Sequence, residues 1–164
     1  MKAQATAATY FKDGERLLES GNLEESIAAY CCAIELEPNW SLAHHKLGEV
    51  LMLQGQLDEA ATSFYRAIKL NPDFSWSYHF LGEALGQQGK LEEAISAYRR
   101  ATKLNPDFSW SYHHLGDALH QQQQWDEAVV AFGKAIELNP EHYGSYFGLG
   151  QSLVQLGQLD EAIA

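Results

Sequence analysis

Residues 70–79 read Leu-Asn-Pro-Asp-Phe-Ser-Trp-Ser-Tyr-His, and residues 104–113 repeat the same ten residues 34 positions later. The same interval of 34 residues separates the four prolines, which are Pro38, Pro72, Pro106 and Pro140. A fixed interval of this length is typical of proteins built from stacked copies of one supersecondary unit. The repeated segment therefore decides the fold, and the rest of the chain is interpreted from it.

Each copy contains two helical patterns separated by a turn. Residues 76–88 have apolar or small side chains at i, i+3, i+4 and i+7, which predicts one amphipathic helix. Gly89 then predicts a helix stop, and residues 92–104 form a second helical pattern. Asn105 precedes Pro106, which disfavours helix and ends the pair. The sequence therefore predicts an all-α chain of repeated helical hairpins.

Other residue types follow the same interval. The glycines are Gly14, Gly48, Gly82, Gly116 and Gly150; the aromatic residues are Tyr30, Phe64, Tyr98 and Phe132; the alanines are Ala33, Ala67, Ala101 and Ala135. In their order and spacing these positions resemble the tetratricopeptide repeat family, in the style of bacterial tandem arrays. The resemblance implies an N-terminal tail at 1–6, full repeats at 7–40, 41–74, 75–108 and 109–142, and a truncated fifth repeat at 143–164. It also implies a single array forming a right-handed superhelical solenoid, whose first helices line a concave groove.

Composition narrows the function. The net charge of −11 disfavours nucleic acid and anionic membranes as partners and favours cationic ones. No signal peptide or apolar run long enough to span a membrane is present, and the only cysteines, Cys31 and Cys32, are adjacent. We therefore expect a cytoplasmic location, reduced thiols and no cofactor. No nucleophile constellation stands out, so we expect no enzyme activity, and Ser41, Ser75 and Ser109 are interpreted as helix caps.

A histidine and a carboxylate one helical turn apart recur in three first helices. The pairs are His45–Glu49, His79–Glu83 and His113–Asp117, and Trp76 and Trp110 stand three residues before the last two. Three interpretations stay open: ion pairs kept by duplication, a ligand-binding surface, or a divalent metal site with His79, Glu83, His113 and Asp117 as candidates. The resemblance to the tetratricopeptide repeat family implies that these eight residues face the groove and bind the partner.

These observations favour a non-catalytic scaffold that binds a peptide or protein segment bearing a basic residue next to an apolar one. Below about pH 6, cationic histidines are expected to offset the carboxylates and weaken this binding. The first alternative is a substrate- or partner-presenting module of a larger enzyme, such as a glycosyltransferase, sulfotransferase or methyltransferase. The second alternative is a divalent-metal-binding protein.

The C-terminal region and one turn depart from the repeat pattern. The fifth repeat stops inside its second helix, so we expect a longer protein or self-association through this end. The apolar residues expected at that surface are Tyr146, Leu149, Leu153 and Ile163. Residues 121–124 are four glutamines and replace the glycine stop seen at Gly55 and Gly89, which leaves the shape of that turn open.

Overall fold

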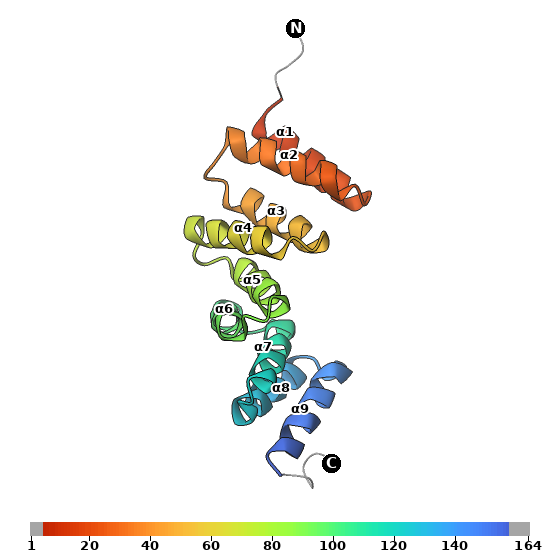
Figure 1. Ribbon diagram of the computed structural model, residues 1–164, viewed down its shortest axis with the longest axis vertical. Coiled ribbons are helices and arrows are strands. Elements are labelled where there is room, and N and C mark those ends of the chain that lie inside the picture. Colours follow the sequence, from red (N-terminus) through yellow and green to blue (C-terminus); the bar gives the residue numbers. More distant parts are fainter. Residues whose placement is uncertain (1–4, 158–164) are drawn as a thin grey trace. The chain divides into compact units, whose positions relative to one another are not determined.

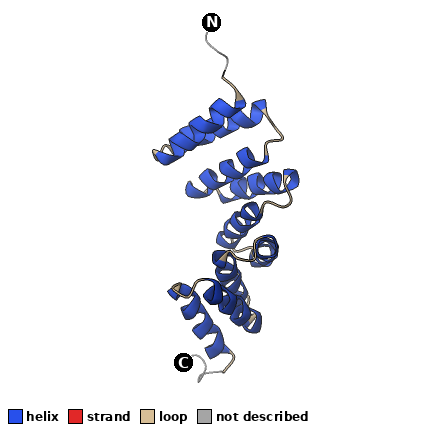
Figure 2. Cartoon of the chain, turned by 180° about the vertical axis from the view of Figure 1, so that it is seen from behind, coloured by secondary structure: helices blue, strands red, loops and turns tan. Residues whose placement is uncertain are grey.

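The structure is a computed structural model that describes residues 5–157. Figures 1 and 2 show that the described residues form helices joined by short loops, with no strand among them. In chain order the helices are α1 (Ala7–Glu19), α2 (Leu23–Leu36), α3 (Ser41–Leu53), α4 (Leu57–Leu70), α5 (Ser75–Gln87), α6 (Leu91–Leu104), α7 (Ser109–Gln121), α8 (Trp125–Leu138) and α9 (Tyr143–Gln155). None of these helices is long and apolar enough to cross a membrane.

Helix bounds follow the predicted pattern closely. The helices predicted at 76–88 and 92–104 are α5 and α6, each displaced by at most one residue. The capping role predicted for Ser41 and Ser109 is wrong, because both residues lie inside the first turn. The N-cap residues are Trp40 and Phe108, and neither side chain accepts a capping hydrogen bond.

The turns inside the hairpins need a left-handed residue. Gly55 and Gly89 adopt φ values of 76° and 75°, which glycine reaches without a steric penalty. Gln123 takes the same place between α7 and α8 with φ 61°. Its neighbour Gln124 donates its backbone N–H to the carbonyl of Leu119, just as Gln56 donates to Leu51 after Gly55. The glutamine run therefore keeps the glycine-type turn, despite a cost of roughly 1–2 kcal/mol for a left-handed side-chain-bearing residue.

The chain divides into two compact units, Met1–Ala84 and Leu85–Ala164, and α5 spans the division between them. In the first unit α2 packs against α1 and α3, and α3 packs against α4. In the second unit α7 packs against α6, α8 and α9, and α9 also packs against α8. Each unit thus buries the apolar faces of its hairpins against one another.

The periodic glycines and aromatic residues meet inside each hairpin. A Cβ atom on Gly48 would lie 2.7 Å from the ring of Phe64, and one on Gly116 would lie 2.8 Å from the ring of Phe132. Both rings are fully buried. Glycine is needed at these positions because the second helix places its aromatic ring directly against the backbone of the first.

Candidate functional site

Two tryptophans on first helices are exposed although neighbouring rings pack against them. Trp76 of α5 is 38% exposed and Trp110 of α7 is 44% exposed. Trp76 stacks on Phe80 with planes 29° apart, and Trp110 stacks on His114 with planes 28° apart. The two identical decamers therefore give both indoles the same local orientation, each leaving one part of the ring open to solvent.

The histidine–carboxylate pair on α3 belongs to a chain of hydrogen bonds, called here the relay, that links neighbouring repeats. His45 Nε2 lies 3.2 Å from Glu49 Oε1, one turn along the helix. On the other side of the ring, His45 Nδ1 lies 3.1 Å from Ser77 Oγ of α5. Lys46 Nζ donates to Glu49 Oε2 over 2.6 Å, so this carboxylate has a cation beside it.

The same relay recurs in the second unit, with one more member. His113 Nε2 lies 3.3 Å from Asp117 Oδ2, and His113 Nδ1 lies 3.2 Å from Ser145 Oγ of α9. Ser145 Oγ also lies 2.7 Å from His142 Nδ1. An ionised carboxylate only accepts hydrogen bonds, so neutral His113 donates Nε2–H to Asp117 and accepts at Nδ1 from Ser145. The serine hydroxyl then accepts from His142 Nδ1–H, and the whole chain of hydrogen bonds is satisfied.

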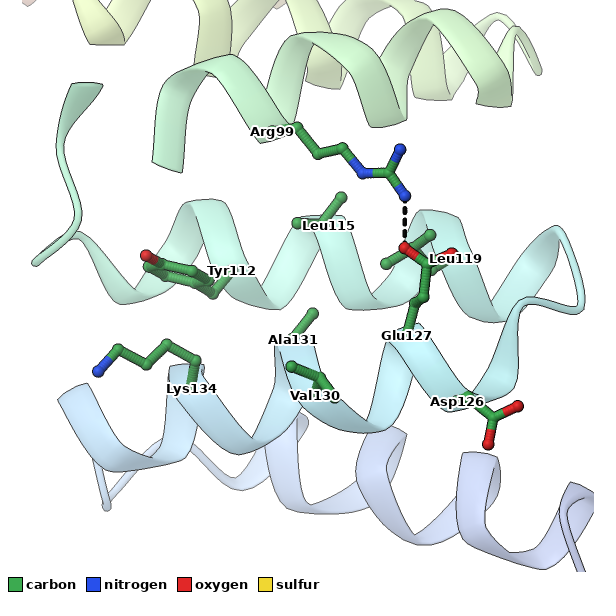
Figure 3. Close-up of a pocket in the computed structure, with 9 residues that line it drawn as sticks. All are labelled: Arg99, Tyr112, Leu115, Leu119, Asp126, Glu127, Val130, Ala131 and Lys134. Atoms are coloured by element: carbon green, nitrogen blue, oxygen red, sulfur yellow. Dashed lines mark hydrogen bonds and ion pairs between the residues drawn. The ribbon is translucent and has the colours of Figure 1, made fainter. Parts of the chain in front are cut away.

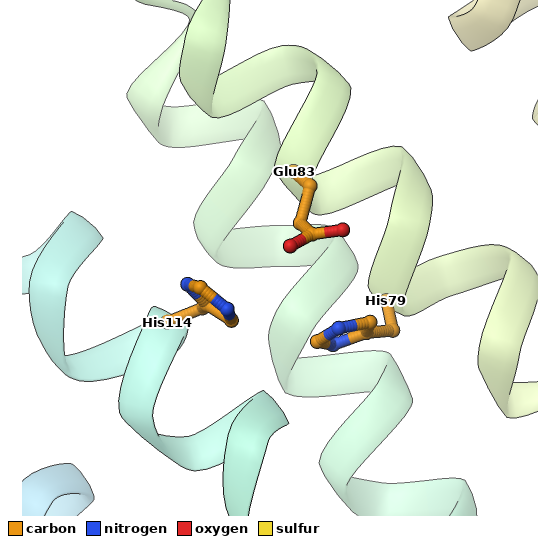
Figure 4. A group of neighbouring side chains, drawn as sticks. All are labelled: His79, Glu83 and His114. Atoms are coloured by element: carbon orange, nitrogen blue, oxygen red, sulfur yellow. The ribbon is translucent and has the colours of Figure 1, made fainter. Parts of the chain in front are cut away.

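Two histidines of the predicted partner-binding set are buried. His45 is 3% exposed and His79 is 5% exposed, so neither ring offers much surface to a partner. Figure 4 shows His79 and Glu83 one turn apart on α5. On these helices Trp76 and Trp110 are exposed to solvent instead, and Glu49, Glu83 and Asp117 are partly exposed.

Many hydrolases also use a serine, a histidine and a carboxylate joined by hydrogen bonds as their catalytic triad. In this protein the same three side chains hold neighbouring repeats together. Ser77 and Ser145 are fully buried, so a substrate carbonyl has no access to either hydroxyl. Sequence reasoning missed these serines because they gain their role only when the next repeat stacks. The available signal was the third position of the last three repeats, which holds Ser77, Ser111 and Ser145.

The ionisation of the groups on α7 differs from the predicted pattern. Burial, together with the neighbouring His114 and His142, lowers the pKa of His113 to about 4. Burial and His142 also lower the pKa of His114. The prediction that the histidines become cationic near pH 6 is therefore wrong for His113. Burial raises the pKa of Asp117 to about 6, so this carboxylate titrates near that pH.

The pKa values of Glu49 on α3 and Glu83 on α5 shift in opposite directions. Burial opposes ionisation of Glu49, but hydrogen bonds from His45 and Lys46 outweigh that effect and lower its pKa. Burial raises the pKa of Glu83. Glu49, Glu83 and Asp117 are thus partly withdrawn from water, where a cationic partner gains more from them than from a fully solvated charge.

A cavity on another face was not predicted. It measures about 480 Å³ and lies between α6, α7 and α8, with apolar walls that include Leu115, Leu119 and Val130 (Figure 3). An ion pair of 2.5 Å between Arg99 and Glu127 crosses its rim. A similar cavity of about 510 Å³ lies between α2, α3 and α4, at the matching positions of an earlier repeat.

Comparison with protein families settles the identity of the repeats. A model of the TPR repeat, the tetratricopeptide repeat, matches residues 14–55, 49–89, 82–123 and 116–157. The chain belongs to the TPR family. No protein of curated function matches the sequence.

Solved TPR structures share this fold. A crystal structure of MamA protein is 27% identical, with a TM-score of 0.91, over 96% of this chain and 86% of that one. MamA from Desulfovibrio magneticus RS-1 is 24% identical, with a TM-score of 0.89, over 96% of this chain and 89% of that one. YrrB, described as a TPR protein with an unusual peptide-binding site, is 23% identical, with a TM-score of 0.86, over 95% of this chain and 80% of that one. The predicted family and the all-α TPR fold are confirmed.

Proposed function

We propose that this TPR chain is a non-catalytic scaffold that binds protein segments through its first helices, at Trp76 in the first unit and at Trp110 in the second. The family supports the general role, since TPR repeats are protein–protein interaction modules. The observation that carries the specific proposal is the pair of exposed indoles in one local orientation. Large, partly exposed aromatic side chains are common anchors in protein interfaces.

The charges near the indoles define the chemistry of the partner. Glu83 lies two turns after Trp76, and Asp117 lies two turns after Trp110, on the same helices. Both carboxylates are partly buried, and the chain as a whole has a net charge of −11. A segment with Arg or Lys next to an apolar side chain satisfies both features, because an indole face also attracts cations. Acidic segments are repelled by the same surface.

A peptide-array screen tests this specificity. The chain is probed in buffer containing a chelator, at neutral pH, against peptides that pair each basic or acidic residue with each apolar one. We expect basic–apolar peptides to dominate the bound set. Their affinity should fall steeply when salt is raised to about 1 M, where the Debye length is about 3 Å. A set dominated by acidic peptides, or one insensitive to salt, contradicts the proposed partner chemistry.

We also propose that the chain self-associates through α9. Phe147 is 68% exposed, and Tyr146 and Val154 are exposed beside it. They line a cavity of about 510 Å³ on this helix. Leu153 was expected to join this surface but is buried within its own unit, and Ile163 lies outside the described residues. Exposed apolar surface of this kind marks interaction sites.

Sedimentation velocity over a range of concentrations tests the self-association. We expect the wild-type sedimentation coefficient to rise with concentration and that of a Phe147→Ser variant to stay constant. Phe147 contributes little to the core, so the variant should keep its thermal stability within about 0.5 kcal/mol. A wild-type chain that remains monomeric at the highest soluble concentration contradicts the proposal.

We place this scaffold in the cytoplasm, because its two adjacent cysteines are free thiols that fit a reducing compartment.

A further inference from the structure

Helix α7 brings three metal-ligating side chains together within the second unit. His113, His114 and Asp117 each offer one ligand atom, and these atoms lie within 4.8 Å of one another. The closest pair, His113 Nε2 and Asp117 Oδ2, is 3.3 Å apart. Two ligands held about 2.0–2.1 Å from a tetrahedral zinc ion are separated by roughly 3.4 Å, so this pair already has the required spacing.

We propose that His113, His114 and Asp117 form a binding site for one divalent transition-metal ion such as Zn²⁺. Two imidazoles and one carboxylate are a common set of three protein ligands for zinc, with water completing the coordination. Imidazole nitrogen favours zinc, cobalt or nickel over magnesium and calcium, which prefer oxygen ligands throughout.

The groups behind His113 suit this role. A metal-binding histidine usually donates its other ring N–H to a nearby acceptor, which fixes the orientation of the ring. Ser145 Oγ stands 3.2 Å from His113 Nδ1 and supplies that acceptor. When the metal takes Nε2, the ring proton moves to Nδ1 and is donated to Ser145. The serine hydroxyl then donates to His142 Nδ1, 2.7 Å away, and His142 carries its own proton on Nε2. The metal replaces the hydrogen bond between His113 Nε2 and Asp117, and Ser145 keeps its hydrogen bonds to His113 and His142.

Comparison with α3 shows why the site belongs to α7. Both helices carry the histidine, the carboxylate one turn later and the serine from the following first helix. They differ at the sixth position of the repeat, which is Lys46 in α3 and His114 in α7. The ammonium of Lys46 lies 2.6 Å from Glu49 and already neutralises it. In α7 an imidazole stands in place of that cation, and its ring nitrogen lies within 4.8 Å of the ligand atoms of His113 and Asp117.

Isothermal titration of the untagged full chain with Zn²⁺ tests the proposal, with Co²⁺ absorption as the spectroscopic measurement. We expect one tight site per chain and a visible Co²⁺ spectrum of four-coordinate type. Ser145→Ala should weaken zinc binding roughly 10–100-fold, as loss of a supporting hydrogen bond does at other zinc sites. Asp117→Asn should weaken it at least as much, because it removes a ligand charge.

His114→Lys is the decisive variant because it recreates the arrangement of α3 and should fold normally. It should abolish tight zinc binding and the Co²⁺ spectrum while leaving the circular dichroism of the apoprotein unchanged. Glu49→Gln, at the matching carboxylate of α3, serves as the control and should bind zinc like the wild type, because Glu49 is held by Lys46. Undiminished binding by His114→Lys, or loss of binding in Glu49→Gln but not in Asp117→Asn, would overturn the assignment. So would a wild-type chain that binds no zinc.

Discussion

Replacing Phe132 by alanine is expected to lower the free energy of unfolding by about 3–5 kcal/mol, the usual cost of removing a buried phenylalanine ring. The ring is fully buried and lies against the backbones of Gly116 in α7 and Gly148 in α9. It therefore joins three helices of the second unit. The substitution leaves a cavity that none of the three helices can fill without moving toward the others.

Denaturant-induced unfolding followed by circular dichroism measures this effect. Val130→Ala is the matched control, because Val130 lies on the same helix and is 72% exposed. Its substitution should change the free energy of unfolding by no more than about 0.5 kcal/mol. Equal stabilities for the two variants would show that Phe132 is not the packing centre of this unit.

Removal of both exposed indoles is expected to produce the largest loss of function. In a Trp76→Ala/Trp110→Ala variant, each substitution should cost at least about 2 kcal/mol of binding free energy, or roughly 30-fold in Kd. The expected loss is measured by fluorescence anisotropy with a labelled basic–apolar peptide. The double variant must first be shown by circular dichroism to retain the helical content of the wild type.

Val130→Ala again provides the control, because Val130 lines the cavity between α6, α7 and α8 and forms no part of the proposed binding site. We expect this variant to bind the peptide with wild-type affinity. Wild-type affinity in the tryptophan double variant would instead mean that the indoles serve packing.

Sequence reasoning predicted the fold because the repeat makes local and global signals agree. Gly89 and Pro106 marked the ends of the α5 and α6 helices to within one or two residues. The identical decamers give Trp76 and Trp110 one local orientation. Helical spacing also placed His113 and Asp117 in contact. All of these features depend on a single helix or on one hairpin.

What the sequence did not predict depends on the contact between successive repeats. The distance from Ser77 to His45 follows from how α5 packs on α3, and periodicity within one helix does not specify it. Burial of His45, and the lowered pKa of His113, follow from the same packing. The sequence shows that the sixth position of the repeat holds Lys46 in α3 and His114 in α7. The effect of this difference on a metal site became clear only when the structure located the carboxylates beside the two residues.

The most direct test of partner binding at Trp76 and at Trp110 is an NMR titration with the best peptide from the array. The chain contains four tryptophans, whose indole N–H signals can be assigned by single Trp→Phe variants. Trp40 stacks on Phe11 in the first unit, and Trp125 begins α8. We predict that the indole signals of Trp76 and Trp110 shift on addition of peptide, while those of Trp40 and Trp125 remain in place. Unchanged signals from Trp76 and Trp110, with shifts confined to backbone amides around Arg99 and Val130, would contradict the account.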